Sequence, residues 1–322
     1  MGFSSFETKQ VLVTGANGFI GSSVVKAFAA NGASVTGIIR QNSDLSKLDD
    51  FKNKVDLRIV NLEDAVAVNE LLKEIRPSYI VHAAQPSAQA AYGLSNPKEL
   101  LGQLNLTATI ATNLLEASKN YLPEKFVHCC GSAIYGNLNT SPFSEDCEPM
   151  PDSPRGLIKL QERNLMRYYA QNFNMPVVLG RIFRAYGPWD SSKKIIVKAL
   201  DVYRNGGSLP LSPEPFMRDY VFIDDISEGI LRMCATDLPN GTELNLGSGT
   251  QYSAAQIVNE LEVLLNDRID ISTEKFPKNF LDKMQYSADL SKTRKLLKWT
   301  PSTSLKDGLR ATIKWHNWVN EH

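Results

Sequence analysis

Short apolar runs alternate with longer segments of helical periodicity along the first half of the chain. Runs of strand length fall at residues 11–13, 33–39, 57–60, 79–84, 125–130 and 177–183. The segments between them that show helical periodicity are 22–31, 66–75, 97–120 and 153–172. Strands that alternate with helices of about ten or more residues are typical of a parallel sheet covered on both faces. The pattern therefore predicts an α/β fold built on a doubly wound parallel sheet.

Three glycines, at positions 15, 18 and 21, stand between the first apolar run and the first helical segment. Gly15 permits a tight turn after the strand, Gly18 lets the backbone approach a diphosphate, and Gly21 lets the helix pack closely on the strand. The start of the helix then offers free N–H groups and a partial positive charge to the phosphates. Glycines also occur in ordinary turns. Placed between a strand and a helix, this triplet predicts dinucleotide binding.

Composition and charge are those of an ordinary globular protein and argue against nucleic-acid or membrane binding. The chain has 322 residues, of which 43% are hydrophobic and 22% charged, as in ordinary globular proteins with one or two domains. Its 35 basic and 35 acidic residues balance, so neither a nucleic-acid partner nor membrane binding is expected. The first ten residues lack the apolar segment of a signal peptide, and the four cysteines lack metal-ligand spacing. We therefore expect a cytoplasmic protein without a bound metal.

The glycine segment and several later motifs resemble one family of enzymes. Residues 14–21, Thr-Gly-Ala-Asn-Gly-Phe-Ile-Gly, have the Gly-x-x-Gly-x-x-Gly spacing of the extended short-chain dehydrogenase/reductases. The segments that resemble later motifs of that family, in the same order, are 181–188, 218–225, 243–249 and 288–301. The resemblance covers residues 10–318, and the chain is identified as a member of the NAD-dependent epimerase/dehydratase branch, which modifies nucleotide sugars. Its first half is also similar, at residues 37–40 and 83–87, to the group of GDP-mannose 4,6-dehydratase and GDP-4-keto-6-deoxymannose reductase.

The resemblance also implies how the chain is divided into domains. Residues 1–176 are expected to form a Rossmann domain that binds NAD or NADP, and residues 177–183 and 242–247 return to its sheet. Residues 184–322 are expected to form mainly a smaller C-terminal domain, which binds the sugar nucleotide. The two longest predicted helices are those that pair in dimers of the family, so we expect a homodimer.

The end of the second predicted strand bears on the choice of cofactor. Enzymes that prefer NAD commonly have an acidic residue there, which holds the ribose hydroxyls. Here Arg40 follows the strand, and no acid occurs before Asp44. Because a guanidinium can pair with a 2′-phosphate, Arg40 favours NADP over NAD, the alternative being a solvent-exposed arginine at a strand end. By the resemblance, the residues expected to contact the cofactor are Gly15, Asn17, Gly18, Phe19, Ile20, Gly21, Arg40, Asn61, Leu62, Ala83, Ala84 and Lys159.

The acid–base residues of the family are altered in this chain. Family members use a Tyr-x-x-x-Lys pair on one face of a helix, where the tyrosine exchanges a proton with the sugar. Lys159 is in place, but the tyrosine position holds Arg155, whose guanidinium stays protonated and has no acceptor. The serine or threonine that binds the same sugar oxygen falls on Gly131. The Asp-Glu pair that 4,6-dehydratases carry next is replaced by Ser132 and Ala133, which disfavours a dehydratase.

Three explanations of these substitutions remain open. The chain is an inactivated variant of an ordinary epimerase or reductase, a cofactor-binding pseudoenzyme, or an enzyme in which another group transfers the proton. We favour an enzyme with Lys159, Ser132 and Arg155 as its catalytic residues, because a neighbouring cation makes the charged form of Lys159 less favourable. Other groups that could transfer the proton are Tyr135, Tyr186, His128 and Cys130.

Two arginines mark the expected substrate site. Arg184 replaces the asparagine of the family's Arg-x-Phe-Asn motif, and Arg218 occupies the position that grips the sugar-nucleotide diphosphate in the family. Two guanidiniums form a strong anion clamp through charge-assisted hydrogen bonds, although Arg184 has a salt bridge within its own domain as an alternative role. With Tyr135 as a further substrate contact, we expect an anionic nucleotide sugar that undergoes hydride transfer.

Overall fold

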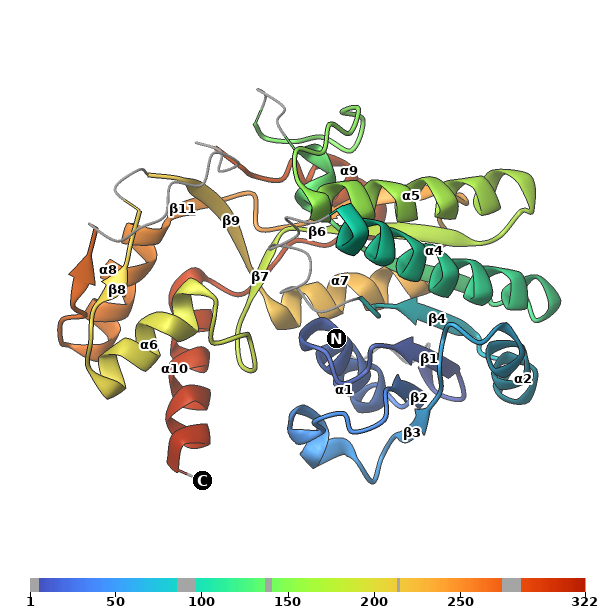
Figure 1. Ribbon diagram of the computed structural model, residues 1–322, viewed down its shortest axis with the longest axis horizontal. Coiled ribbons are helices and arrows are strands. Elements are labelled where there is room, and N and C mark those ends of the chain that lie inside the picture. Colours follow the sequence, from blue (N-terminus) through green and yellow to red (C-terminus); the bar gives the residue numbers. More distant parts are fainter. Residues whose placement is uncertain (1–5, 86–96, 137–140, 213–214, 274–284, 322) are drawn as a thin grey trace.

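The computed structural model describes residues 6–85, 97–136, 141–212, 215–273 and 285–321. Residues 86 and 87, which belong to one of the resemblances in the first half of the chain, lie outside these ranges. The elements divide into a large sheet with helices on both faces and a smaller group of strands and helices at one end (Figure 1).

The large sheet has seven strands, and every pair of neighbours is parallel. In spatial order the strands are β10 (Thr242–Leu246), β6 (Val177–Ile182), β5 (Lys125–Gly131), β4 (Tyr79–His82), β1 (Gln10–Thr14), β2 (Ser34–Ile39) and β3 (Asp56–Ile59). The direction of the strand order reverses between β1 and β4, and ligands of such sheets bind at the carboxyl ends of the strands beside this point. The predicted doubly wound parallel sheet is thereby confirmed.

Helices cover both faces of this sheet. One face carries α1 (Phe19–Ala30) and α7 (Ile223–Ala235), and the other carries α2 (Ala65–Ile75), α4 (Pro97–Asn120) and α5 (Pro154–Asn172). Helix α1 begins at Phe19 rather than at residue 22, because Gly18 is its N-cap and the glycine turn passes directly into the helix. The helix predicted at 97–120 has the bounds of α4.

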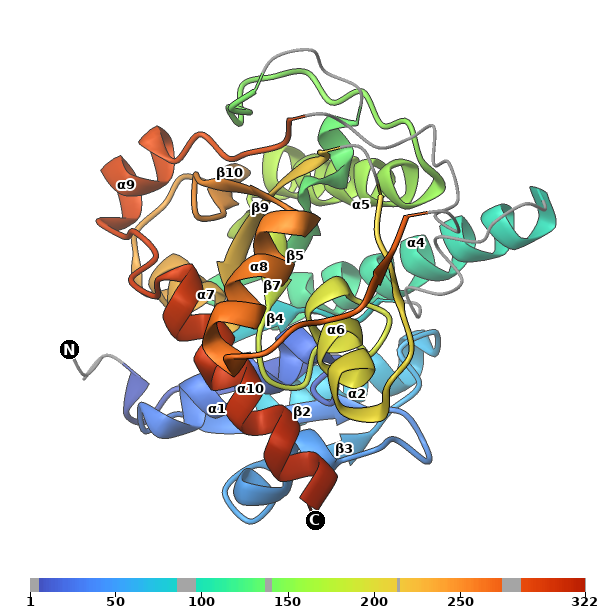
Figure 2. The same cartoon turned by 90° about the vertical axis from the view of Figure 1, so that its left-hand side faces the viewer.

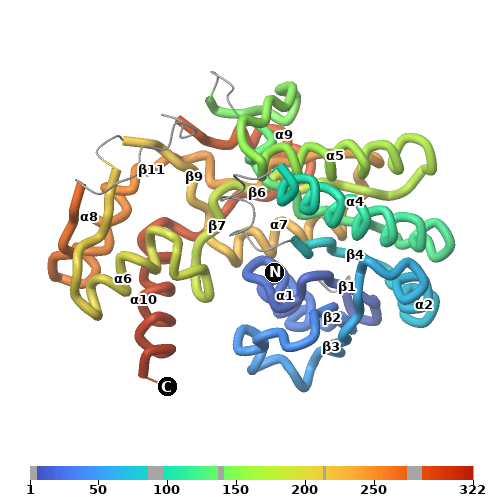
Figure 3. The backbone as a smooth tube through the Cα atoms, in the orientation of Figure 1, coloured from blue at the N-terminus to red at the C-terminus, as the bar shows by residue number. Residues whose placement is uncertain are grey.

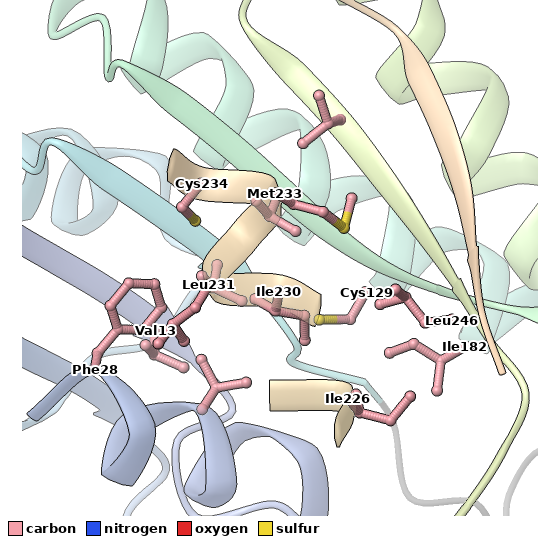
Figure 4. Close-up of a cluster of buried hydrophobic side chains, with 14 of the residues drawn as sticks. Val13, Phe28, Cys129, Ile182, Ile226, Ile230, Leu231, Met233, Cys234 and Leu246 are labelled. Carbon is pink, nitrogen blue, oxygen red and sulfur yellow. The ribbon is translucent and has the colours of Figure 1, made fainter. Parts of the chain in front are cut away.

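Helix α7 packs on the large sheet although it lies far along the sequence from most of its strands. Figure 4 shows Ile226, Ile230 and Leu231 of α7 among side chains of the sheet and of α1, including Val13 and Phe28. All five of these side chains are buried in one apolar core. The sequence that follows the predicted domain boundary at 183 therefore contributes to the core beside the large sheet, and the division into domains stays a prediction.

A second group of elements has its own apolar core. It contains the three-stranded sheet of β7 (Arg184–Tyr186), β9 (Met217–Phe222) and β11 (Gln251–Ser253), and the two-stranded sheet of β8 (Leu209–Pro210) and β12 (Ile271–Ser272). Its helices are α6 (Ile195–Asn205), α8 (Ala254–Leu265) and α10 (Leu305–Glu321). Helix α9 (Ser291–Leu297) packs instead on the apolar core that α1 and α7 form with the large sheet. The tube in Figure 3 shows α6, α8 and α10 at one end of the molecule, and in Figure 2 that end faces the viewer.

The described residues contain neither a membrane-spanning helix nor a metal-binding cluster. No helix among them combines the length and the apolar character needed to cross a bilayer. Within the same residues, no group of three or more histidine, cysteine, aspartate and glutamate side chains is arranged to hold a metal ion.

Candidate active site

The glycine turn lies against the end of β4, at the point where the strand order reverses. Gly15 has a φ of +67°, and a Cβ atom on it would lie 2.8 Å from the Cα atom of Ala84. A Cβ atom on Gly21 would lie only 2.1 Å from the carbonyl oxygen of Gly15. The Ala84 amide donates a hydrogen bond to Thr14 Oγ1 at 3.2 Å, which joins the two strand ends. Side chains at Gly15 or Gly21 would therefore push the turn, the helix and β4 apart.

The first turn of α1, where the phosphates are expected to bind, contains no acidic side chain that would repel them. Its N-cap, Gly18, is exposed and has no side chain to cap the helix, and the first turn contains no acidic residue. Asn17 is fixed by a 3.4 Å hydrogen bond from its side-chain amide to the carbonyl oxygen of Asp44. Free N–H groups at the helix start, an N-cap glycine without a side chain and the absence of acidic residues in the first turn fit the diphosphate of a dinucleotide.

The residues that are expected to contact the adenosine of the dinucleotide lie on the loops that follow β2 and β3. Arg40 directly follows β2 and is exposed, with its backbone amide bound to Ser43 Oγ at 3.1 Å. Asn61 is exposed and Leu62 is buried on the next loop. The Asn113 side chain of α4 holds this loop by donating to the Leu62 carbonyl at 3.0 Å. These positions are open to a ligand at the sheet edge, and the roles of the residues stay predictions.

Lys159 and Gly131 meet at the end of β5. Helix α5 starts at Pro154 and is capped by Ser153, whose hydroxyl accepts a hydrogen bond from the Gly156 amide at 3.1 Å. From this helix the Lys159 ammonium reaches the Cys129 carbonyl at 3.1 Å. A Cβ atom on Gly131 would lie 3.9 Å from both Cε and Cγ of Lys159, which is an ordinary contact distance. The position where the family has its hydroxyl is therefore adjacent to Lys159 and has room for a side chain.

Arg155 and Ser132 flank this point. Arg155 lies one turn before Lys159 on α5, and residues four apart share a helix face. Ser132 is the first residue of the short 3₁₀ helix η3 (Ser132–Tyr135) and is half-buried. Its carbonyl accepts a hydrogen bond from the hydroxyl of Tyr286, a residue from the C-terminal part of the chain that the sequence analysis missed.

Several residues that were considered for proton transfer are deeply buried. Burial raises the pKa of Cys130 to about 11 and raises the pKa of the Tyr186 hydroxyl, which donates to the Leu305 carbonyl. Burial lowers the pKa of His128 well below its usual value. Charged forms of these side chains are therefore unfavourable, and they are poorer candidates than Lys159 or Ser132.

The structure does not support Tyr135 as a substrate contact. Its side chain is fully buried and stacks on Phe143 with ring centroids 4.9 Å apart. Its hydroxyl donates to Asn245 Oδ1 and accepts from Arg181 Nη1, both at 2.7 Å. Both hydrogen-bonding directions of the hydroxyl are thus used inside the protein. The sequence pattern missed this because η3 turns the side chain inward just after the strand ends.

A row of buried polar side chains lies on the face of the large sheet that α4 and α5 cover. Thr14, His82 and His128 occupy matching register positions on the adjacent strands β1, β4 and β5. Thr14 Oγ1 and His82 Nδ1 are 2.8 Å apart, and the rings of the two histidines are 5.3 Å apart. Burial, with Lys159 adding a smaller effect, lowers the pKa of His82 to about 3, so its ring is neutral near pH 7. The row ends at Glu162 of α5, which is also buried and which the sequence analysis missed.

Arg184 and Arg218 share one face of the three-stranded sheet. Arg184 of β7 is in register with Tyr220 of β9, and its guanidinium lies 5.7 Å from the centre of that ring. Arg218 lies two residues before Tyr220 on the same strand, so both point to the same side. The Arg218 guanidinium lies 5.8 Å from the centre of the Tyr286 ring. Tyr286 therefore contacts both Arg218 and the site beside Ser132.

Comparison with known proteins gives consistent matches over the whole chain. The family model for GDP-mannose 4,6 dehydratase matches residues 12–312. UDP-glucuronate 4-epimerase from Thermodesulfobacterium geofontis (strain OPF15) is 29% identical over 316 residues, which cover 94% of this chain and 95% of the relative. The uncharacterized UDP-glucose epimerase YtcB from Bacillus subtilis (strain 168) is 28% identical, with 94% of this chain and 96% of the relative covered.

A solved structure agrees with these matches. It is UDP-glucuronic acid 4-epimerase from Bacillus cereus in complex with UDP-glucuronic acid and NAD. It matches this chain with a TM-score of 0.86 at 27% identity, covering 96% of this chain and 99% of the other.

Proposed function

The chain belongs to the GDP-mannose 4,6-dehydratase family of the extended short-chain dehydrogenase/reductases, and on that premise we propose that it binds a nicotinamide dinucleotide and modifies a nucleotide sugar by hydride transfer. One observation supports this most strongly. The close-packed glycine turn, with Gly15 against Ala84 and Gly21 against Gly15, opens onto the same sheet edge as Lys159. The turn that we propose for the dinucleotide and the residue that we propose as proton carrier are thus at one edge of the sheet.

The dinucleotide supplies the redox chemistry, because its nicotinamide accepts a hydride from a sugar carbon and returns it. The glycine turn and the start of α1 would hold the diphosphate, while the loops carrying Arg40 and Asn61 would hold the adenosine. The structure of the Bacillus cereus relative contains NAD. In this chain Arg40 offers a guanidinium to a 2′-phosphate, and we propose it as the residue that sets the preference for NADP.

The substrate that we propose is a nucleotide-linked sugar, held as an anion by Arg184 and Arg218. The two side chains lie on the same face of one sheet, and paired guanidiniums suit phosphate or carboxylate oxygens. The Bacillus cereus relative binds UDP-glucuronic acid, which carries a diphosphate and a carboxylate. Epimerisation of such a sugar, by oxidation and re-reduction at one carbon, needs a proton carrier, and Lys159 is the residue that we assign to it.

A second candidate is a member of the family that binds the dinucleotide without catalysis. It is favoured by Arg155 and Gly131, which remove both hydroxyls of the family's acid–base site. The two candidates differ in turnover. Purified protein would be incubated with either dinucleotide and a panel of nucleotide sugars, and the absorbance of reduced nicotinamide and the epimer composition would be followed. Formation of an epimer or an oxidised sugar supports the enzyme, whereas binding without conversion of any sugar in the panel supports the second candidate.

We further propose that the chain forms a homodimer through α4 and α5. These helices pack side by side, and the Gln161 side chain of α5 donates to the Leu104 carbonyl of α4 at 2.8 Å. Exposed apolar side chains on the pair are Leu101, Leu157 and Tyr168, and Phe173 follows at the C-cap of α5. Analytical ultracentrifugation at micromolar concentration should give the mass of two chains, and a monomer alone would refute the proposal.

A further inference from the structure

Glu162 is a buried carboxylate placed directly behind Lys159. Its side chain is fully buried, and Oε2 lies 3.2 Å from the Lys159 ammonium nitrogen. Its other oxygen, Oε1, accepts a hydrogen bond from the Gln85 side chain at 2.6 Å. The residues are three apart on α5, so they lie on one face of the helix. The close pair is thus built into the helix that carries the catalytic position.

The surroundings leave Lys159 as the partner that balances the charge of Glu162. His128 Nε2 is 3.8 Å from the carboxylate, but burial keeps the pKa of this histidine well below its usual value, so its ring is neutral. An isolated buried charge is unfavourable in a protein interior, and a close partner offsets that penalty. A proton that moves from Lys159 to Glu162 leaves the net charge of the pair unchanged. Both forms of the pair are therefore compatible with the buried site.

Lys159 needs such a partner if it is to take a proton from a substrate. An ammonium group has three donors and no acceptor, so it must lose a proton before it can accept one. In most of the family a tyrosine hydroxyl receives the proton of the sugar, but here Arg155 stands in that place. Glu162 is in contact with the ammonium through Oε2, and a carboxylate oxygen can accept a proton.

We propose, on the basis of the proposed function, that Glu162 is the proton acceptor behind Lys159 and replaces the missing tyrosine as the store of the sugar's hydroxyl proton. When the sugar hydroxyl is oxidised, its O–H bond breaks and a new N–H bond forms on Lys159. An N–H bond of Lys159 breaks in the same step, and an O–H bond forms on Glu162. The dinucleotide named above takes the hydride. Re-reduction of the sugar carbonyl reverses each proton transfer, so an epimerisation leaves the pair as it began.

The test compares two substitutions that separate charge from shape. Glu162→Gln keeps the size of the side chain but cannot take the proton, whereas Glu162→Asp keeps the carboxylate and shortens the chain. We expect E162Q to lose about 100-fold in the rate of sugar oxidation, as for removal of a general base. We expect E162D to retain more activity than E162Q, and both to bind the dinucleotide with a Kd close to that of the unaltered protein. Glu228→Gln, at a partly exposed ion pair on α7, is the matched control.

A measurement on the ligand-free protein tests the pair itself. Urea denaturation of K159M, E162Q and the double variant should show that the double variant loses less stability than the sum of the two single losses. Additive losses would overturn the proposal. So would an E162Q variant as active as the E228Q control, or one that is more active than E162D. If the unaltered protein converts no nucleotide sugar, the proposed function fails and this inference fails with it, whereas turnover that is indifferent to Glu162 refutes this inference alone.

Discussion

Replacing Gly21 with alanine should disrupt the dinucleotide site through a backbone clash. The added Cβ atom would lie 2.1 Å from the Gly15 carbonyl oxygen and 2.8 Å from the Gly15 carbonyl carbon. Both are backbone atoms, so the helix must move away from the turn. Overpacking of this kind costs about 3 kcal/mol at the upper end of its usual range, and the better helix propensity of alanine returns about 1 kcal/mol. We therefore expect a net loss of about 2 kcal/mol in the free energy of unfolding.

Gly131→Ala is the matched control, because the same methyl group meets no obstacle there. Gly131 has an extended backbone, with φ of −131° and ψ of 151°, and its Cβ atom would lie 3.9 Å from Lys159. A substitution of glycine by alanine without strain stabilises a protein by about 0.4–1 kcal/mol, since the unfolded chain loses freedom. Urea denaturation should therefore separate the two variants by roughly 3 kcal/mol.

The binding of the dinucleotide supplies the second readout of this comparison. Calorimetric titration should show at least an approximately tenfold weaker affinity in the Gly21 variant, equal to about 1.4 kcal/mol, and unchanged affinity in the Gly131 variant. If G21A unfolded at the same urea concentration as G131A and bound the dinucleotide equally well, the packing of the turn would not matter. The reasoning from the glycine contacts would then be refuted.

Three further outcomes are expected. Arg40→Ala should weaken the binding of NADP by about 1–3 kcal/mol in a calorimetric titration if the guanidinium holds the 2′-phosphate, and an unchanged affinity would remove that role. The double variant G131S with R155Y restores the two hydroxyls of the family's acid–base site, so gain of epimerase or reductase activity would show a decayed site, whereas loss of a native activity would show a specialised one. Burial lowers the pKa of His82 to about 3, below the value of about 6.5 in an unfolded chain, so unfolding takes up a proton between these pH values. His82 alone should therefore lower the free energy of unfolding by about 1.4 kcal/mol for each pH unit between about 6.5 and about 3, and His82→Asn should reduce the slope by that amount in urea denaturation, while an unchanged slope would contradict a neutral buried ring.

The sequence was sufficient for features that depend on local patterns. The apolar run before Gly15 and the helical segment after Gly21 identified a strand, a turn and a helix, because each is set by neighbours in the chain. The parallel sheet followed from the alternation of such elements. The bounds of α4, Pro97–Asn120, were also predicted, since Pro97 can start a helix and the apolar positions repeat regularly after it.

Features that depend on contacts between distant strands could not be predicted in the same way. The row of Thr14, His82 and His128 exists because β1, β4 and β5 are neighbours in a particular register, which no single segment records. The pairing of Glu162 with Lys159 could have been predicted from the sequence, because Glu162 lies three residues after Lys159 on a predicted helix and carries the opposite charge. Tyr135 was misjudged because its burial depends on Asn245 and other residues far along the chain.

Two pairs of the expected site residues lie together in the structure. Lys159 lies beside Gly131, and Arg184 shares a sheet face with Arg218, as a single ligand site requires. Arg155 stands at the position of the family's tyrosine and lies one turn before Lys159 on α5, so the two residues share one face of the helix. The roles of these residues in a reaction stay predictions.

The proposed function depends first on the binding of a nicotinamide dinucleotide at the glycine turn. Calorimetric titration of purified protein, freed of bound small molecules, with NAD and with NADP tests it most directly. We predict saturable binding of one of the two dinucleotides at one site per chain, with affinity lost in the Gly21→Ala variant. If neither dinucleotide binds, the glycine turn is not a dinucleotide site and the proposed function is refuted.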